Sequence, residues 1–429
     1  MIELPSGLDE IEAVLGPLAA EFDVAGFSLY LVGGVVRDLY IGGHSTIDDL
    51  DLTTDALPQQ IKGLVEPFAT AIWAQGEKFG TIGATIDGRA VEITTHRAEV
   101  YSSSTRKPSV EFGTAITDDL IRRDFTLNAM AIQLPGREFL DPHNGLDDLE
   151  QRCLRTPASP EVSFSDDPLR MFRAARFMAR FDLVAESSLI DAARDLAARI
   201  KIVSVERVQA ETERLLALPN PERGLRFLFD TDLLPIVIPS LGTQSNRSKA
   251  LRLAAMPGSV LVRRAGLLFF VPDPTVVLRG LHYPLNEIKQ TANVIDQAKR
   301  VLSTELSPSL IRRAVDAVGR PAVSEVIALL SNIDNLKSCD ERTGVADQFE
   351  TAYRLLARDE DLDDLGSPVS GGELIAELGI EPGPAVGLLV KYLTGCRMET
   401  GPISRSEAIE RARQWHQNLP DRASPPKCD

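Results

Sequence analysis

The sequence predicts an α+β protein in which a small mixed-sheet domain comes first and an all-helical region follows. Between residues 27 and 95, short runs with strand character alternate with tight turns and one short helix. From about residue 167 onward, strand patterns nearly vanish and the 3.6-residue helical period dominates. The chain has 429 residues, too many for one ordinary core, so we expect several domains.

The first predicted elements are a strand, a turn, a helix and a second strand within residues 27–54. F-S-L-Y-L-V is an apolar strand run, G-G follows it, V-V-R-D-L-Y reads as a short helix, and I-D-D-L-D-L reads as the next strand. Residues 79–95 predict two more strands, because F-G-T-I-G-A-T-I and A-V-E-I-T-T both alternate around the tight turn D-G-R.

The later elements are helices separated by proline-containing breaks. D-P-L-R-M-F-R-A-A-R-F-M-A-R-F and V-E-R-V-Q-A-E-T-E-R-L-L-A-L carry the clearest helical period. The breaks fall near residues 219–221, 235–239, 272–274 and 382–384. Residues 419–429 are rich in proline and polar residues and are expected to form a disordered tail.

Composition limits the classes of function. No apolar run approaches the length of a membrane span, no secretory signal is visible, and four dispersed cysteines favour a reducing cytoplasm over a disulfide framework. The net charge of −16 is uneven, because residues 151–300 hold 22 Lys+Arg against 16 Asp+Glu, a net of +6. We therefore expect any polyanionic partner to meet the middle of the chain.

The acidic cluster in T-I-D-D-L-D-L-T-T predicts a metal site. Side chains alternate along a strand, so Asp49 and Asp51 point to one face while the leucines between and after them point to a core. Two carboxylates on one face can hold a pair of Mg²⁺ ions, and Glu92 on a neighbouring strand is a candidate third ligand. A lone D-x-D is more often an acidic turn without a ligand, so the preceding residues decide its interpretation.

Those preceding residues, L-V-G-G-V-V-R-D, predict a phosphate site. Gly33 and Gly34 end a strand and open a helix, where glycine lets the backbone and the first helical N–H groups approach a phosphate. Arg37, one turn later, can fork onto the same phosphates. Asp38 is expected to pair with Arg37 or with a later basic residue.

These two blocks resemble the head of the nucleotidyltransferase superfamily, and more specifically the class II CCA-adding tRNA nucleotidyltransferases and bacterial poly(A) polymerases. The match covers roughly residues 28–216 and rests on blocks that occur together and in order. After the two blocks above come L-I-R-R-D-F-T-L-N-A-M-A-I (120–132), L-D-P-H-N-G-L-D-D-L (140–149), S-D-D-P-L-R-M-F-R-A-A-R-F (165–177) and V-E-R-V-Q-A-E (205–211). One departure is Asp166, where the family usually has Glu.

The resemblance implies a domain order and a set of site residues. The expected parts are a catalytic head (1–150), a neck that recognises the base (151–240), a body (241–330) and a tRNA-binding tail (331–418). It also implies a flexible loop within 97–108. The implied catalytic and metal-binding residues are Asp49 and Asp51. The implied nucleotide-binding residues are Gly34, Arg37, Arg123, Asp167, Arg170, Arg173 and Arg176.

Asp167 and Arg170 are the expected readers of the base. We expect both to lie on one helix, where a spacing of three puts them on the same face. A helix N-terminus with a carboxylate cap and a helical salt bridge is the plain alternative. A carboxylate accepts from the amino group that C and A share, and an Arg donates to the adjacent ring nitrogen. The same-sign row that continues through Arg173, Arg176 and Arg180 favours a phosphate or RNA partner.

The expected reaction is attack of an RNA 3′-hydroxyl on the α-phosphate of CTP or ATP, assisted by two Mg²⁺ ions, with tRNA as the RNA partner and no obligatory protein partner. Within the family, CC-only addition, A-only addition and poly(A) synthesis remain alternatives to CCA. A D-x-D glycosyltransferase is the alternative from another class; it accounts for Asp49 and Asp51 but not for R-R-D-F-T-L-N-A.

Overall fold

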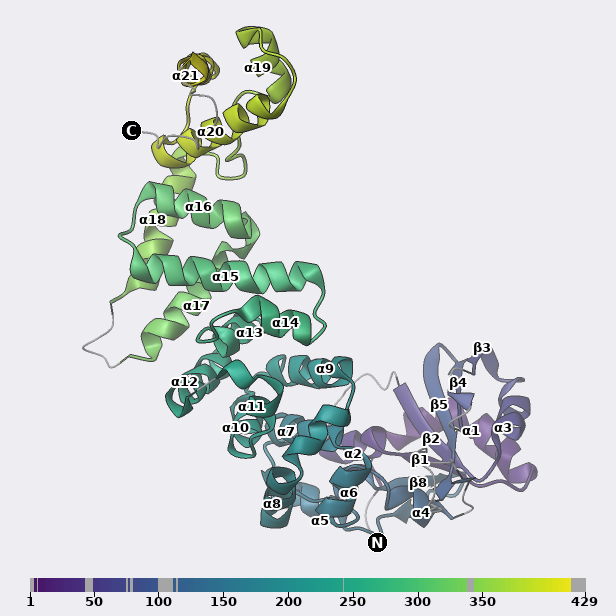
Figure 1. Ribbon diagram of the computed structural model, residues 1–429. Helices are drawn as coiled ribbons and strands as arrows, with labels where there is room; N and C mark the ends of the chain where they lie inside the picture. Colours follow the sequence, from purple (N-terminus) through teal and green to yellow (C-terminus); the bar gives the residue numbers. More distant parts are fainter. Residues whose placement is uncertain are drawn as a thin grey trace. The chain divides into compact units, whose positions relative to one another are not determined.

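A computed structural model describes residues 4–5, 7–42, 49–74, 76–77, 80–98, 111–112, 115–241, 243–337 and 343–417 (Figure 1). The chain forms two compact units. The first comprises residues 1–211 and 223–237, and the second comprises residues 212–222 and 238–429. The predicted four-part division is not tested by these units and stays a prediction. The expected tail at 419–429 and most of the expected loop at 97–108 lie outside the described residues.

The first unit is built on a seven-stranded mixed sheet in the order β3-β4-β5-β2-β1-β8-β9. In this order β2 and β5 pair in parallel, and the other neighbours are antiparallel. Its strands are β1 (Leu29–Val32), β2 (Asp49–Thr54), β3 (Ala69–Trp73), β4 (Thr81–Ile86), β5 (Arg89–Thr95), β8 (Ala131–Leu134) and β9 (Phe139–Leu140). Two short ladders are β6 (Arg97–Ala98) with β7 (Glu111–Phe112), and β10 (Cys153–Leu154) with β11 (Val184–Ala185).

Helices make up much of the remainder of residues 8–237. They are α1 (Leu8–Val24), α2 (Gly34–Ile41), α3 (Pro58–Val65), α4 (Ile116–Leu120), α5 (Gly145–Glu150), α6 (Pro160–Asp166), α7 (Leu169–Arg180), α8 (Ser187–Asp195), α9 (Val205–Leu216), α10 (Glu222–Asp230) and α11 (Leu233–Val237), with 3-10 turns η2 (Thr126–Asn128) and η3 (Ala197–Ile202). The strand–turn–helix–strand order within 27–54 and the two strands within 79–95 are therefore confirmed.

The core of the first unit fixes which face of the sheet is free. Apolar side chains of α1 and α3 pack with those of the central strands into one buried cluster. Leu50 and Leu52 of β2 belong to it, each 1% exposed, as do Val91 and Ile93 of β5. Because side chains alternate, position 51 on β2 turns away from this core.

The second unit is helical in its described part, as predicted. Its elements are η4 (Pro239–Leu241), α12 (Gln244–Ala255), α13 (Val260–Leu268), α14 (Pro274–Gly280), α15 (Leu285–Ser303), α16 (Pro308–Val318), η5 (Arg320–Ala322), α17 (Val323–Asn335), α18 (Val345–Asp359), α19 (Gly371–Leu378), α20 (Pro384–Thr400) and α21 (Arg405–Gln417). The last three helices share a small core that includes Leu389, Leu393 and Trp415. Within the described residues, no helix combines the length and apolarity needed to cross a bilayer.

Candidate active site

The glycine turn after β1 is a point of close approach. Gly33 has φ +77°, a conformation that side chains other than glycine rarely adopt, and α2 begins at the next residue. A Cβ placed on Gly33 would lie 2.8 Å from Nη1 of Arg123 and 3.8 Å from Oδ2 of Asp51. The turn, the Arg123 guanidinium and the Asp51 carboxylate therefore converge, although they come from three separate segments.

Asp51 lies beside a second carboxylate on the free face of the sheet. In the parallel pairing of β2 with β5, Asp51 is the register partner of Glu92, and both residues are exposed. Asp49 is the first residue of β2, two positions before Asp51, and its side chain lies outside the described part. Among the described side chains, no cluster of three or more His, Cys, Asp or Glu residues has the arrangement of a metal site. The oxygen donors of Asp51 and Glu92 are of the kind that Mg²⁺ prefers.

A cavity of about 420 Å³ joins this carboxylate face to the α6–α7 turn. Four of the predicted site residues line it: Asp51, Arg123, Asp167 and Arg170. Its other lining residues are Val32, Leu52, Thr94, Asp119, Arg122 and Asp166. Gly34, Arg37, Arg173 and Arg176, which were also predicted, are not among the lining residues.

Asp119 is a cavity residue that the sequence prediction missed. It lies on α4, is 8% exposed, and forms an ion pair of 3.0 Å with Arg123 four residues later. The spacing of four between Asp119 and Arg123 in T-D-D-L-I-R-R could have predicted this ion pair. The carboxylate holds the Arg123 guanidinium beside the glycine turn.

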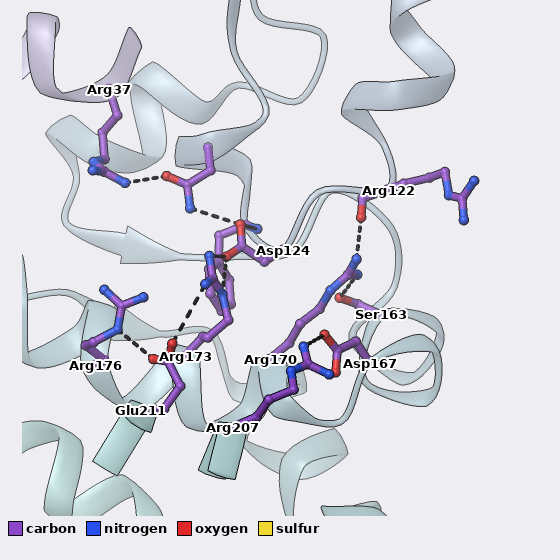
Figure 2. A network of polar contacts seen from close by, with 12 residues as sticks. Arg37, Arg122, Asp124, Ser163, Asp167, Arg170, Arg173, Arg176, Arg207 and Glu211 are labelled. Carbon is purple, nitrogen blue, oxygen red and sulfur yellow. Dashed lines mark hydrogen bonds and ion pairs between the residues drawn. The ribbon is translucent and has the colours of Figure 1, made fainter. Parts of the chain in front are cut away.

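Arg170 is held from two sides at the cavity wall. Its Nη1 donates to Oγ of Ser163 at 2.8 Å, and its Nη2 donates to the backbone carbonyl of Arg122 (Figure 2). Burial lowers the pKa of Arg170 and nearby Asp124 opposes that shift. Since arginine stays charged at any physiological pH, the effect is a desolvated and oriented cation.

Asp167 does not share a helix with Arg170, which corrects our expectation. It follows the last residue of α6 and precedes Pro168, and its φ and ψ of −136° and 98° are extended. Its Oδ1 accepts from the backbone N–H of Leu169 at 3.1 Å, and its Oδ2 accepts from Arg207 of α9 at 2.8 Å (Figure 2). The residue before a proline disfavours helical geometry, so this was foreseeable; Arg207 was not predicted.

Arg173 and Arg176 belong to a polar network outside the cavity lining, and its two carboxylates, Asp124 and Glu211, are buried. Arg173 donates to Oδ2 of Asp124 through both Nε, at 2.8 Å, and Nη2, at 2.5 Å. Arg176 donates from Nε to Glu211 of α9 at 2.7 Å, and Glu211 is only 2% exposed. Burial opposes ionisation of Asp124, but the Arg173 cation and the Asn128 amide outweigh it and keep the pKa of Asp124 below its ordinary value.

Arg37 reaches the same network from the other side. Its Nη1 donates to Oδ1 of Asn128 at 2.5 Å, and the Asn128 amide donates to Oδ1 of Asp124 at 2.9 Å (Figure 2). Arg37 also pairs with Asp38 at 2.7 Å, and its guanidinium lies 4.6 Å from the ring centroid of Phe181. The predicted pairing of Asp38 is thus confirmed, while contact of Arg37 with phosphate stays a prediction.

The exposed carboxylates of the sheet, the glycine turn at the start of α2 and the arginine-lined cavity are parts that a nucleotidyltransferase needs to hold metal ions and a triphosphate. The family model "Poly A polymerase head domain" matches residues 29–155, and "Probable RNA and SrmB- binding site of polymerase A" matches residues 186–244.

The curated relatives refine this class. The CCA-adding enzyme of Streptococcus gordonii is 30% identical over 395 residues, covering 91% of this chain and 93% of that protein. That of Limosilactobacillus reuteri is 29% identical over 387 residues, covering 88% and 90%. The chain belongs to the family of CCA-adding enzymes.

Solved structures support the fold. The Bacillus stearothermophilus CCA-adding enzyme in complex with CTP superposes with a TM-score of 0.73 at 23% identity, covering 95% of this chain and 99% of that chain. The Thermotoga maritima CCA-adding enzyme complexed with tRNA gives a TM-score of 0.66 at 23% identity, covering 94% and 95%.

Proposed function

We propose that this protein is a template-independent tRNA nucleotidyltransferase that adds CCA to tRNA 3′ ends from CTP and ATP. The observation that carries the proposal is the cavity lined by Asp51, Arg123, Asp167 and Arg170 beside the Gly33 turn. Family membership supports nucleotidyl transfer and removes support from the glycosyltransferase hypothesis. The names of the relatives favour CCA over CC-only, A-only or poly(A) products.

The triphosphate is the part of the substrate that the glycine turn would hold. Backbone N–H groups at the start of α2 and the Arg123 guanidinium converge there, and both favour anionic oxygens. Asp119 keeps Arg123 oriented before the substrate arrives. This preorganisation lowers the cost of ordering a flexible side chain on binding.

The base would meet Asp167 and Arg170. Arg207 and the Leu169 N–H fix the Asp167 carboxylate, while Ser163 and the Arg122 carbonyl fix the Arg170 guanidinium. A fixed carboxylate accepts from the amino group of C or A, and a fixed Arg donates to the ring nitrogen beside it. U and G present the opposite pattern and would leave buried polar groups unpaired, which is the strongest basis for rejecting them.

The family generally uses divalent metal ions, and we propose two Mg²⁺ ions held at Asp49 and Asp51, with Glu92 as a further ligand. The pairing of Asp51 with Glu92 and the oxygen chemistry of both groups fit this metal. Bound Mg²⁺ would lower the pKa of the attacking hydroxyl and would neutralise negative charge on the leaving pyrophosphate. In the reaction the 3′-oxygen bonds to the α-phosphorus, the bond to the bridging oxygen breaks, and the hydroxyl proton passes to water.

The direct test supplies purified protein with a tRNA transcript that ends at the discriminator base. CTP and ATP are added singly and together with Mg²⁺, and the 3′ ends are sequenced. We expect two C residues with CTP alone and CCA with both nucleotides. Long A tails would reassign the product to poly(A), and addition of C alone or A alone in the presence of both would reassign it to a partial enzyme. A cytoplasmic location remains part of the proposal.

A further inference from the structure

Two stacked aromatic rings lie among the arginines of the polar network. Phe177 of α7 is 3% exposed, and its ring centroid lies 5.7 Å from that of Phe181, the residue that follows this helix, at an interplanar angle of 20°. Phe125, which comes directly after Asp124, meets Phe177 edge-on at a centroid distance of 5.4 Å. All of these residues belong to the first compact unit. Packing within that unit therefore fixes where the two stacked rings lie.

Phe177 is surrounded by guanidinium groups that are predicted to bind the nucleotide. The guanidinium carbon of Arg176 lies 4.6 Å from the centroid of the Phe177 ring, and those of Arg37 and Arg173 lie 5.4 Å and 5.6 Å from it. All three distances are within the limit of about 6 Å for attraction between a cation and an aromatic ring. Because Arg37 comes from α2 and the other two come from α7, one ring serves two segments.

Phe181 adds a second ring beside Arg37. The guanidinium carbon of Arg37 lies 4.6 Å from the Phe181 centroid, and that of Arg180 lies 4.8 Å from it. These two arginines also approach one carboxylate, because Nη2 of Arg37 is 2.7 Å and Nη2 of Arg180 is 3.7 Å from Asp38. Burial lowers the pKa of Arg37, Asp38 opposes that shift, and the Arg180 cation adds to it. Like charges are thus close together, and the negative face of a ring offsets their repulsion.

The rings restrict movements that the carboxylates leave open. A guanidinium group is planar, and hydrogen bonds to a carboxylate hold it at its edge. Arg173 is held in this way by Asp124, and Arg176 by Glu211. A ring packed beside the guanidinium carbon also limits tilting about that edge. The edge contact and the ring contact together define one orientation of each arginine.

We propose that Phe177 is a positioning residue for the nucleotide site, because its ring holds three arginines that are predicted to contact the nucleotide. Phe181 has the same role for one of them, Arg37. The inference rests on the proposed function, since that function assigns these arginines to nucleotide binding. The alternative is that both phenylalanines only fill apolar space, in which case another apolar side chain of similar size would serve equally well.

The test compares Phe177→Leu with Phe172→Leu. Leucine keeps most of the apolar bulk but has no aromatic face. Phe172 is a matched control because it lies on the same helix and is 1% exposed, and among the described residues none of the cation–π contacts involves its ring. Calorimetry measures CTP binding to the free protein with Mg²⁺, and kinetics on tRNA that lacks CCA give KM for CTP and kcat. Thermal unfolding is recorded for each variant, and binding is measured well below the transition.

We expect Phe177→Leu to weaken CTP binding about 10-fold, the scale of a lost cation–π contact in a desolvated site. KM for CTP should rise while kcat changes little, because the arginines would bind the ground state and the transition state alike. Phe172→Leu should lower the melting temperature through lost core packing, and it should leave both the CTP affinity and KM unchanged.

A second pair of variants keeps the inference testable if Phe177→Leu does not fold. Phe181 is partly exposed and borders a cavity of about 710 Å³, so the hydroxyl group of Phe181→Tyr has room. Phe181→Tyr retains the aromatic ring and should bind CTP as the wild type does. Phe181→Leu lacks the ring and should bind CTP about 3-fold more weakly.

Unchanged CTP affinity in Phe177→Leu would overturn the inference, as would equal losses of affinity in Phe177→Leu and Phe172→Leu. For the second pair, equal CTP affinities of Phe181→Tyr and Phe181→Leu would do the same. Failure of the proposed function is a separate result. It would appear as absence of C and A addition to tRNA by the wild-type protein, whatever the variants do.

Discussion

Replacing Gly33 with alanine separates the cost to the fold from the cost to the site. The φ of +77° and ψ of −136° lie in a region that L residues rarely adopt, at a cost on the order of 1–3 kcal/mol. The added Cβ would also lie 2.8 Å from Nη1 of Arg123, where ordinary contact begins at 3.4 Å. The guanidinium is the end of a flexible side chain, so it can retreat by about 0.6 Å at little cost in stability. The predicted damage is to function, because a misplacement approaching 1 Å can reduce activity on the order of 100-fold.

Gly88→Ala is the control for this experiment. Gly88 lies in the turn between β4 and β5, has φ +76°, and has no heavy atom of the described chain within 4 Å of the point where an added Cβ would lie. Both variants should lose stability in thermal unfolding, because both glycines have a positive φ. Only Gly33→Ala should lose CTP incorporation, measured as kcat/KM on tRNA that lacks CCA. Equal activity in the two alanine variants would show that the close approach of Gly33 to Arg123 is not needed for activity.

Three other substitutions test single side chains: Asp124 in the polar network, Arg170 in the cavity wall and Glu92 on the face of the sheet. Asp124→Asn should cost about 1.5–3 kcal/mol near neutral pH, because it removes the carboxylate that accepts two hydrogen bonds from Arg173. The folded pKa of Asp124 is depressed, so this advantage of the wild type is fully present above the unfolded pKa of about 4. It is lost as the pH falls from there through the folded pKa. Urea unfolding at several pH values would show a shrinking difference in unfolding free energy between wild type and variant. Arg170→Lys should raise KM for CTP by roughly 10-fold or more, since lysine cannot make both fixed contacts; an unchanged KM would contradict its assignment. Glu92→Gln should raise the Mg²⁺ concentration needed for half-maximal activity, and an unchanged Mg²⁺ dependence would remove it from the ligand set.

Local patterns were sufficient to predict the elements that carry the site. Alternation of apolar residues separated Leu50 and Leu52 from Asp51, and the glycine pair marked the change from strand to helix at Gly33. Both predictions depend on near neighbours in the chain, where periodicity and turn chemistry act. The helical period likewise predicted a helix within D-P-L-R-M-F-R-A-A-R-F-M-A-R-F, where α7 spans Leu169–Arg180.

Contacts between distant segments were beyond such patterns. Asp124 meets Arg173, 49 positions away, and Asp167 meets Arg207, 40 positions away, because tertiary packing brings their segments together. The row of arginines on α7 was interpreted as a surface for phosphate. The structure shows that Arg173 and Arg176 also bind buried carboxylates, and their contact with the nucleotide stays a prediction. A single-sign row on one helix cannot reveal partners that other segments supply.

The most direct measurement of the central claim is incorporation of CTP by Asp51→Asn. The substitution keeps the shape of an exposed strand residue, so the melting temperature should match that of the wild type. With Mg²⁺ and tRNA lacking CCA, single-turnover addition of C should fall by about 1,000-fold or more, the scale of lost electrostatic stabilisation at a reacting phosphate. Addition of C at the wild-type rate by Asp51→Asn would contradict the claim that this carboxylate face is the catalytic centre.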